Sequence, residues 1–508
     1  MIEMTLAEVA AATGGRLHRA TGDERVDHVE FDSRTVGPGG LFLALPGERV
    51  DGHDFAAAAL AAGAAGVLAA REVAAPAVIV PPAPRGATAT GSYLAAADRD
   101  GSGAAVLSAL ARLATRTVAA LPDLTVVGVT GSSGKTSTKD LLAAVLAPLG
   151  PTVAPPGSFN NELGLPWTVL RAGRGTRHLV LELSARGRGH IAALCAVARP
   201  RIGVVLNVGR AHVGEFGSPE AIAAAKGELV EALPADGIAV LNADDPRVAA
   251  MAPRTRARVV TVGRARGADV RADGVALDAG RARFTLAAPG GTADVALRLV
   301  GAHHIGNALA AAAVALELGA SPEQVAGVLS AAEPVSRWRM EVTDRPDGVT
   351  VVNDAYNANP ESMRAALQAL VSMAGAPAGG SAPGPAGSPH HVDAPHHVDA
   401  PHHGKQSADS YQARRSWAVL GRMGELGDAS AAAHVEVAAA AAELGVDELV
   451  TVDAPEYSAG RRVSSVDAAL ALLRRELAPG DVVLVKASRA AGLDRLAAAL
   501  LEQREPVA

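Results

Sequence analysis

The chain has 508 residues, of which 49% are hydrophobic, and its formal net charge is −6 at pH 7. At roughly 150 residues per domain this length predicts about three domains, with ample apolar material for their cores. The slight negative charge offers no basic surface for a polyanion, so we expect no nucleic-acid partner. Cys195 is the single cysteine, which excludes a disulfide framework within one chain.

The N-terminal stretch does not have the pattern expected of a signal peptide. It contains Glu3 and Glu8 and lacks the basic residues with which a signal peptide begins. Alanine-rich runs such as residues 56–70 are interrupted by glycine and do not reach the length of apolar sequence that spans a bilayer. We therefore expect a cytoplasmic protein without a membrane span.

Residues 1–115 predict a small α/β unit. A helix is expected over residues 6–12, a strand over 41–45 and a second helix over 102–120. Ser33 and Arg34 belong to an Asp-Ser-Arg turn, a pattern that fits either a structural turn or a ligand-binding one.

Residues 125–149, TVVGVTGSSGKTSTKDLLAAVLAPL, predict a strand, a phosphate-binding loop and a helix. Gly131 and Gly134 let the backbone curl so that its N–H groups face an anion. Lys135 is positioned to reach the phosphates and Thr136 to place its hydroxyl on Mg²⁺, while the helix N-terminus adds partial positive charge. The full predicted loop comprises Gly131, Ser132, Ser133, Gly134, Lys135, Thr136 and Ser137.

The loop departs from the usual G-x-x-x-x-G-K-[ST] spelling at one position. The first glycine of that pattern falls at Val129, and Gly128 lies one place early. The alternative interpretation is a Ser/Gly turn with a chance lysine. Because the flanking strand and helix patterns are both present, we predict a nucleoside triphosphate site.

Residues 121–333 favour a doubly wound domain with a parallel sheet. Apolar strands over 179–183, 202–208 and 237–241 alternate with helical stretches, and ligands of such sheets gather at the strand carboxyl ends. Glu182, His212 and Lys226 fall near those ends. Taken singly, His212 also fits a core histidine and Lys226 a solvated helix lysine; together they indicate a metal site beside the triphosphate.

Lysine is scarce in this chain. Of 47 basic residues only five are lysines, at positions 135, 139, 226, 405 and 486. A lysine that remains among so many arginines is a candidate for a task that needs a compact amine, although mutational chance is the alternative for any one of them.

Three further polar features accompany this domain and the region after it. Asn160 and Asn161 lie in a loop over residues 158–164, and Asn307 lies in the first turn of an alanine-rich helix over 303–318. Residues 374–414 are rich in Ala, Gly and Pro and then read PHHVDAPHHVDAPHHGK, a composition that predicts disorder. Transition-metal binding by the His pairs is the alternative use of that segment.

Motifs taken in order resemble the ATP-dependent Mur ligases of peptidoglycan synthesis. They are GSSGKT, the NNELG loop, LELS, AH with FGS, AKGEL, LNADDP and GAHHIGNAL. VVNDAYNANPESM resembles the member that adds D-alanyl-D-alanine to UDP-MurNAc-tripeptide, and DSRTVGPGGLFLALPGERVDGHDF is similar to the UDP-binding domain of that family. The resemblance covers essentially the whole chain apart from residues 374–414.

The resemblance implies an α/β fold of three domains. Residues 1–115 would form a small UDP-sugar-binding domain, and residues 116–333 a central doubly wound P-loop ATPase domain. Residues 334–508 would form a Rossmann-like C-terminal ligase domain that carries the disordered insertion 374–414.

The resemblance also implies a catalytic centre. Lys135 and Thr136 would hold the ATP phosphates and a first Mg²⁺, with Glu182 as a further ligand of that ion. His212 and Lys226 would serve a second Mg²⁺, Lys226 as its N-carboxylated form. The scarcity of lysine supports this independently, because a guanidinium does not readily form such a carbamate.

Further positions are implied to bind nucleotide or substrate. Asn307 would face adenine, Asp354 the ribose and Asn357 the nucleotide side of the C-terminal domain. The implied substrate residues are Ser33 and Arg34 for the uridine diphosphate, together with Asn160, Asn161, Arg339, Asn359, Lys486, Ser488 and Arg489.

The implied reaction is amide ligation through an acyl phosphate, with UDP-MurNAc-tripeptide and D-Ala-D-Ala as partners and a monomeric enzyme. Two alternatives stay open within enzymes: a sibling ligase that adds the third amino acid, and a folate-glutamylating ligase. A nucleotide-switched binding protein with a metal-loading His segment is the alternative outside enzymes. The sequence leaves open whether the accepted tripeptide ends in diaminopimelate or lysine.

Overall fold

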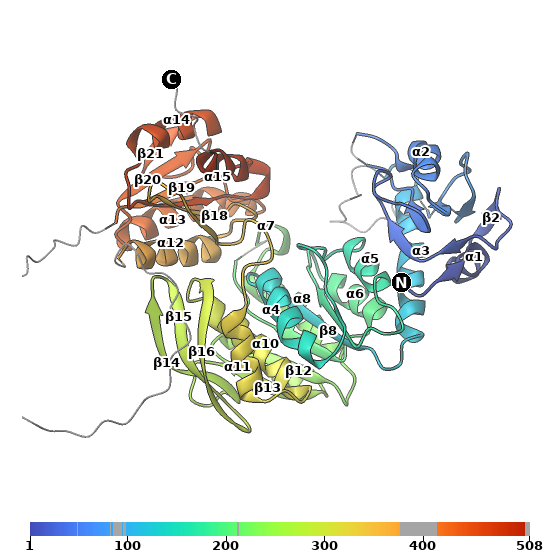
Figure 1. Cartoon of the computed structure of the whole chain (residues 1–508), viewed down its shortest axis with the longest axis horizontal. Helices are drawn as coiled ribbons and strands as arrows, with labels where there is room; N and C mark the ends of the chain where they lie inside the picture. Colours follow the sequence, from blue (N-terminus) through green and yellow to red (C-terminus); the bar gives the residue numbers. More distant parts are fainter. Residues whose placement is uncertain are drawn as a thin grey trace, which may run out of the picture.

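The computed structural model describes residues 1–47, 49–81, 83, 84, 94, 98–210, 213–375 and 414–502. The expected residues His212 and 376–413 therefore lie outside the described part of the chain. The N-terminal, central and C-terminal parts each carry a sheet (Figure 1), which agrees with the three-domain α/β fold that the sequence predicts. The boundaries between these parts stay predictions.

The N-terminal part is built on a five-stranded sheet in the order β2-β7-β6-β5-β4. Its strands are β2 (Arg16–His18), β4 (His28–Glu30), β5 (Gly40–Leu43), β6 (Gly66–Ala69) and β7 (Ala77–Ile79), and β1 (Met4–Thr5) pairs separately with β3 (Arg25–Val26). The helices are α1 (Leu6–Thr13), α2 (Ala56–Ala61) and α3 (Ser102–Ala119).

Helix α3 joins the N-terminal and central parts. It packs on α1 on one side and on α5 (Gly164–Leu170) and α6 (His190–Ala198) on the other. The Trp167 indole N–H donates to the Val29 carbonyl at 2.8 Å across the same junction. The apolar face of α3 is thereby buried between two sheets, which fixes the two parts against each other.

The central part contains a nine-stranded sheet in the order β16-β15-β14-β13-β12-β11-β8-β10-β9. Its parallel strands are β8 (Thr125–Thr130), β9 (Thr152–Val153), β10 (His178–Glu182), β11 (Ile202–Val205), β12 (Ile238–Asn242) and β13 (Arg258–Gly263). Strands β8, β10 and β11 are almost wholly buried, as near-continuous apolar runs in a doubly covered parallel sheet should be. The strand order reverses at β8, where ligands of such sheets bind.

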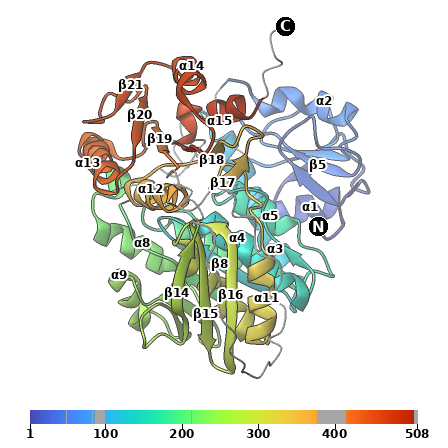
Figure 2. The same ribbon diagram turned by 60° about the vertical axis from the view of Figure 1, so that its left-hand side comes forward.

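Three further strands, which were not predicted from the sequence, extend this sheet; the first pairs in parallel with β13, and the three are antiparallel to one another. They are β14 (Val270–Asp278), β15 (Arg281–Ala288) and β16 (Gly291–Val300), which lie at the lower edge of the molecule in Figure 2. Their inner faces join the central core beneath α10 (His304–Glu317) and α11 (Pro322–Ala331). The other helices of the central part are α4 (Lys135–Leu146), α7 (Val213–Phe216), α8 (Pro219–Glu231) and α9 (Pro246–Ala249).

The C-terminal part has a six-stranded sheet in the order β17-β18-β22-β19-β20-β21. Its strands are β17 (Glu341–Asp344), β18 (Thr350–Asp354), β19 (Ser416–Leu420), β20 (Glu448–Val452), β21 (Arg461–Val463) and β22 (Val482–Lys486). The helices are α12 (Pro360–Ala374), α13 (Ser430–Glu443), α14 (Val466–Glu476) and α15 (Asp494–Leu501). Only β17 runs antiparallel to its neighbour.

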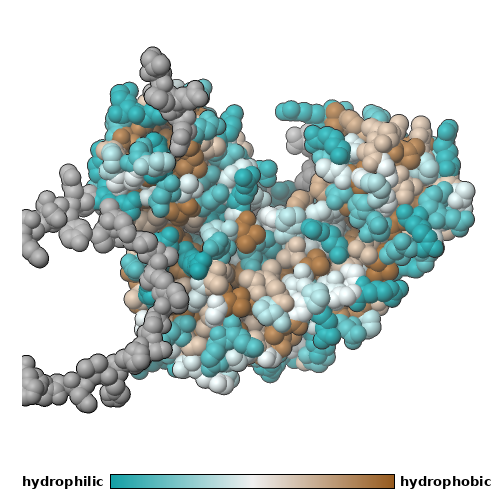
Figure 3. All heavy atoms as spheres, viewed as in Figure 1, coloured by the Kyte–Doolittle hydropathy of each residue, from teal (hydrophilic) through white to brown (hydrophobic). Residues whose placement is uncertain are grey.

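The C-terminal and N-terminal parts both rise from the central part, and a broad hollow separates them in the space-filling view (Figure 3). The carboxyl end of β18 in the C-terminal sheet and the loop after β8 in the central sheet border one cavity. Within the described residues, no helix has the length and apolarity needed to cross a membrane.

Candidate active site

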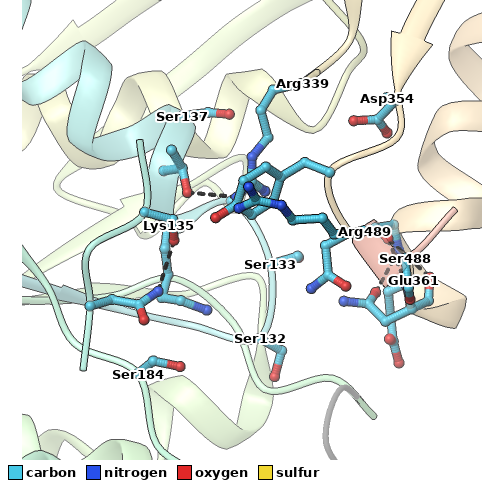
Figure 4. A pocket seen from close by; sticks show the side chains of 18 of the residues that line it. Ser132, Ser133, Lys135, Ser137, Ser184, Arg339, Asp354, Glu361, Ser488 and Arg489 are labelled. Atoms are coloured by element: carbon cyan, nitrogen blue, oxygen red, sulfur yellow. Dashed lines mark hydrogen bonds between the residues drawn. The ribbon is translucent and has the colours of Figure 1, made fainter. Parts of the chain in front are cut away.

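A cavity of about 550 Å³ lies between the central and C-terminal parts (Figure 4). It brings together most of the residues that the sequence predicts for the site. Those that line it are Ser132, Ser133, Gly134, Lys135, Thr136, Ser137, Asn160, Asn161, Asn307, Arg339, Asp354, Asn357, Asn359, Lys486, Ser488 and Arg489.

The loop between β8 and α4 consists of Gly131–Gly134 and has a conformation that requires glycine at its end. Gly134 has φ +82°, in the left-handed region, and a Cβ there would lie 2.5 Å from Asn307 Oδ1. Val129 lies within β8 and is fully buried, so the residue that departs from the usual loop spelling is a strand residue. The loop is simply shorter than the usual pattern.

The start of α4 is an anion-binding site in its geometry. The backbone N–H groups of Gly134, Lys135, Thr136 and Ser137 donate to no acceptor within the described residues, and the helix has no side-chain cap. Four free amides at the positive end of a helix are suited to phosphate oxygens.

Lys135 lies beside these amides, and its Nζ donates to the Gly131 carbonyl at 2.7 Å. Burial lowers the pKa of the Lys135 amine; the Glu182 carboxylate opposes that shift and the Arg339 charge adds to it. The amine is therefore held where the opposing charge of a phosphate would favour its protonated form.

Glu182 ends β10 behind the cavity wall and is fully buried. Its Oε2 accepts hydrogen bonds from Ser158 Oγ at 2.9 Å and Asn160 Nδ2 at 3.3 Å. Its Oε1 has no hydrogen-bond donor among the described residues. A buried carboxylate oxygen without a partner is costly, and a cation is the kind of ligand that would satisfy it.

Lys226 is on α8, is 5% exposed and does not line the cavity. Within the described residues it has neither a hydrogen bond nor an ion pair. Burial lowers the pKa of its amine well below the usual range, and the nearby Lys135 charge acts in the same direction. The position thus holds an amine for which the described part of the chain offers no acidic partner to stabilise its charge.

The described residues contain no group of three or more His, Cys, Asp or Glu side chains that would hold a metal ion by themselves. This does not contradict the predicted magnesium sites, because Mg²⁺ is usually held by one or two carboxylates together with phosphate oxygens. Thr136 and Glu182 fit that pattern. The predicted ligand His212 lies outside the described residues.

The C-terminal wall of the cavity is organised by a buried ion pair. Lys486 Nζ donates to Asp354 Oδ2 at 2.6 Å and to the Asn357 carbonyl at 2.9 Å. Asp354 Oδ1 accepts from the Met340 N–H at 3.2 Å. These bonds hold together the carboxyl ends of β18 and β22 and the segment that leads into β17.

Arg339 connects this wall to the phosphate loop. Its Nη2 donates to Thr136 Oγ1 at 2.9 Å, and its guanidinium lies 4.1 Å from the centre of the Tyr356 ring. Trp338 and Met340 on either side have φ +60° and +50°, a conformation that is strained for residues with side chains. The segment that connects the central and C-terminal parts therefore holds Arg339 against Thr136 on a conformationally restricted backbone.

Other predicted residues have local structural partners. Asn161 Oδ1 accepts from the Gly164 N–H at 2.9 Å, and Asn359 Oδ1 caps α12 by accepting from the Ser362 N–H at 2.9 Å. Ser488 Oγ accepts from the Gly424 N–H at 2.7 Å, and Arg489 lies 5.7 Å from the Trp338 ring centre. Their roles toward substrate stay predictions.

Ser33 and Arg34 do not line the cavity, and their role toward the uridine diphosphate stays a prediction. Arg34 makes two hydrogen bonds to the Asp32 carboxylate, at 2.9 and 2.7 Å, which lower the pKa of Asp32 to about 2. The exposed guanidinium is thus already oriented by its neighbour.

Several residues at the cavity were not predicted from the sequence. Asn207 contacts the phosphate loop, Ser158 orients Glu182, and Tyr356 stacks on Arg339. An asparagine inside the apolar run 202–208 was the available signal for the first of these, since an amide in a buried strand needs a partner.

A glycine loop with free helix amides, at the switch point of a parallel sheet and facing a second α/β part, defines a P-loop nucleotide-binding enzyme. Family comparison is specific: Mur ligase middle domain matches residues 129–315, Mur ligase family, catalytic domain matches 25–113, and Mur ligase, glutamate ligase domain matches 338–379 and 387–489. The chain belongs to the Mur ligase family.

Curated relatives match over almost the whole chain. The UDP-N-acetylmuramoyl-tripeptide--D-alanyl-D-alanine ligase of Mycobacterium tuberculosis (strain ATCC 25618 / H37Rv) is 53% identical, over 99% of this chain and 98% of the relative. The enzyme of the same name from Escherichia coli (strain K12) is 32% identical, over 99% of both chains.

Solved structures agree with these relatives. A MurF structure from Acinetobacter baumannii superposes with a TM-score of 0.79 at 28% identity, covering 99% of each chain. MurF ligase from Thermotoga maritima in complex with ADP gives a TM-score of 0.72 at 28% identity, covering 93% of this chain and 96% of that one.

Proposed function

We propose that the chain is an ATP-dependent ligase that joins D-alanyl-D-alanine to UDP-MurNAc-tripeptide in peptidoglycan precursor synthesis. The observation that carries this is the 53% identity to UDP-N-acetylmuramoyl-tripeptide--D-alanyl-D-alanine ligases over 99% of the chain. The same identity removes the support for a ligase that adds the third amino acid, for folate glutamylation and for a non-enzymatic nucleotide switch.

The chain's own residues supply positioning and charge. The free amides at the start of α4 and the Lys135 amine bind the ATP phosphates. The tripeptide carboxylate then attacks the γ-phosphorus, the bond to the β,γ-bridging oxygen breaks, and an acyl phosphate and ADP are formed. The dipeptide amine then displaces phosphate. Because charge accumulates on oxygens in both steps, Lys135 and Arg339 lower the barrier by electrostatic stabilisation rather than by covalent chemistry.

Magnesium supplies further charge neutralisation on the phosphates when bound. The unpartnered Oε1 of buried Glu182 and the Thr136 hydroxyl support a first ion at their side of the cavity. His212 and Lys226 would hold a second.

Lys226 acts as its N-carboxylated form in this proposal. Its amine is buried and has no acidic partner among the described residues, so an uncharged amine is available to react with CO₂. The carbamate carries a negative charge and oxygen ligands, which Mg²⁺ prefers, whereas an ammonium would be repelled by that ion.

The remaining assignments follow from the same reaction. Asp354 and Asn307 bind ribose and adenine, and Ser33 with Arg34 binds the uridine diphosphate. The enzyme works in the cytoplasm, where ATP and nucleotide sugars are made. It works as a monomer, because the N-terminal, central and C-terminal parts that bind the substrates all belong to one chain. Light scattering of the purified protein tests the last point.

The test of the function is ADP release with mass spectrometry of the nucleotide product. We expect ADP release only when UDP-MurNAc-tripeptide and D-Ala-D-Ala are both present, with one pentapeptide product formed for each ADP. Tripeptides ending in diaminopimelate and in lysine are compared in parallel. ATP hydrolysis that is indifferent to both substrates would contradict the proposal.

A further inference from the structure

Asn207 makes several hydrogen bonds to the phosphate loop. It follows the end of β11, and β11 is the parallel neighbour of β8, with Val205 paired to Thr130. The segments that leave the carboxyl ends of these two strands therefore meet, which brings the Asn207 carboxamide against the loop after β8.

The carboxamide satisfies three backbone groups of the loop. Its Oδ1 accepts from the Ser132 N–H at 3.0 Å and from the Ser133 N–H at 2.9 Å. The Asn207 backbone carbonyl shares the first of these donors, since it also accepts from the Ser132 N–H at 3.1 Å. The carboxamide Nδ2 donates to the Ser133 carbonyl at 3.2 Å. An amide side chain is the group that offers an acceptor for two N–H groups and a donor for one carbonyl.

Asn207 is itself held on both sides. The Leu206 carbonyl accepts from Asn242 Nδ2 at 2.8 Å, and the Val208 N–H donates to Asp245 Oδ2 at 2.8 Å. The Gly209 N–H donates to Ser132 Oγ at 2.9 Å, which ties the next residue to the loop as well. The carboxamide is therefore a fixed support and not a freely rotating side chain.

These bonds divide the amides of the loop into two sets. The N–H groups of Ser132 and Ser133 donate to Asn207, whereas those of Gly134 to Ser137 have no acceptor within the described residues. A short loop has few residues whose own contacts can fix its backbone conformation. The hydrogen bonds from Asn207, which follows the neighbouring strand, fix that conformation instead.

We infer that Asn207 is a positioning residue for nucleotide binding: it holds the short loop in the phosphate-binding conformation so that Lys135 and the first amides of α4 are preorganised. This rests on the proposed use of ATP. If the loop had to become ordered during binding, part of the binding free energy would be used to order it. Because the loop contacts the phosphates, the affinity for ADP would fall and the affinity for the nucleoside alone would not.

The experiment compares wild type, Asn207→Ala and Asn207→Asp by calorimetric titration with ADP and with adenosine. For Asn207→Ala we expect ADP to bind about 10- to 100-fold more weakly, with adenosine changed less than threefold. Asn207→Asp keeps the two accepted bonds but loses the donated one and adds a negative charge near the phosphates, so the same selective loss is expected. Asn242→Ala removes the bond to Leu206, which helps to hold Asn207, but none of the bonds to the loop, so a smaller loss of ADP affinity than in Asn207→Ala is expected.

Steady-state kinetics separate positioning from general damage. Positioning predicts a raised KM for ATP with kcat at saturating ATP within about threefold of wild type, because Lys135 is still present. A merely structural role would lower kcat through loss of folded enzyme and leave KM and the ratio of ADP to adenosine affinity unchanged, which would overturn the inference.

A second result would also overturn it. If the Asn207 carboxamide only occupies an amide that the phosphates need, Asn207→Ala would free the Ser133 N–H and ADP would bind more tightly. Failure of the proposed function is seen separately, as a wild-type protein that binds no ADP or releases none with both substrates. An unchanged Asn207→Ala beside an active wild type would refute the positioning role alone.

Discussion

Lys486 and Asp354 form a buried ion pair between the carboxyl ends of two neighbouring parallel strands, with Nζ 2.6 Å from Oδ2. The strand register pairs these two residues directly, so the contact is a consequence of sheet geometry and not of flexible side chains meeting by chance. Lys486 is one of only five lysines in the chain. Among the four that the structure describes, it alone pairs with an acid that the sequence predicts to bind the nucleotide.

Removal of one partner of this pair should destabilise the protein. Lys486→Met leaves the Asp354 carboxylate buried without its counter-charge, which typically costs about 3–5 kcal/mol. Urea unfolding measures the loss. The double variant Lys486→Met/Asp354→Asn should recover part of it, and strictly additive losses in the double variant would contradict a direct pairing.

Lys135→Arg should lose activity although the charge is kept. The Nζ lies 2.7 Å from the Gly131 carbonyl inside a four-residue loop, where a planar guanidinium does not fit. We expect kcat/KM to fall by about 100-fold or more, the size of effect that follows loss of one charge-stabilising donor. Near-native turnover with intact ADP binding would remove Lys135 from its assigned role.

Lys226→Arg should be inactive if the carbamate is required, because arginine does not form one. Lys226→Glu should be at best weakly active, since its shorter side chain misplaces the carboxylate. Wild type loaded with ¹³C-bicarbonate should show a carbamate carbon signal that is absent from Lys226→Arg. Wild-type turnover in the arginine variant, or full activity of wild type after rigorous bicarbonate depletion, would show the carbamate to be unnecessary.

Arg210 links the central part to two helices of the C-terminal part. Its guanidinium makes hydrogen bonds to both carboxylate oxygens of Glu436, at 2.9 and 2.6 Å, and its backbone N–H donates to Glu361 Oε1 at 2.8 Å. Because the side chains are partly exposed, Arg210→Ala should change the free energy of unfolding by less than about 1 kcal/mol.

The orientation of the two parts should respond more than stability does. We expect Arg210→Ala to enlarge the radius of gyration in small-angle X-ray scattering at low salt, and 1 M NaCl to have the same effect on wild type. Arg364→Ala, whose Glu443 contact lies within the C-terminal part, is the matched control and should leave the radius unchanged. Equal radii for all three proteins would deny Arg210 this role.

His304 should make stability depend on pH. It is 3% exposed and its ring centre lies 4.2 Å from that of His303; burial, with the His303 charge acting in the same direction, holds the pKa of His304 well below its usual value. The unfolded chain binds a proton near pH 6.5 and the folded chain does not, so stability is full above about pH 6.5 and falls as the pH is lowered.

The measurement is urea unfolding of wild type and His304→Gln at pH 7.5, 6.0 and 5.0. The variant should lose less stability than wild type over this interval, because one buried imidazole no longer takes up a proton on unfolding. Parallel losses in the two proteins would mean that His304 does not contribute.

The phosphate loop and the parallel strands were predictable because their signals are local. Gly131, Gly134 and Lys135 lie within five residues of one another, and the strands around them are continuous apolar runs. The α/β fold predicted from these patterns is confirmed. The strand expected over 202–208 ends at Val205 instead, because Asn207 leaves the ladder to contact the loop.

What depends on packing between distant segments was not predictable. Strands β14 to β16 have mixed alanine, arginine and glycine sequences whose apolar alternation becomes clear only when α10 and α11 cover them. Likewise, the pairing of Lys486 with Asp354 joins residues 132 positions apart, and the location of Lys226 behind the cavity wall depends on how α8 packs. No pattern in one sequence carries such information.

The place of β22 in the C-terminal sheet has a consequence for synthesis of the chain. Strand β22 lies near the end of the sequence but pairs with both β18 and β19 in the sheet. Neither β18 nor β19 can form this pairing until residues 482–486 have left the ribosome. The central sheet closes much earlier, whereas the C-terminal one waits with exposed edges and a high contact order. A chain truncated before β22 should therefore retain a folded nucleotide-binding half attached to an aggregation-prone remainder.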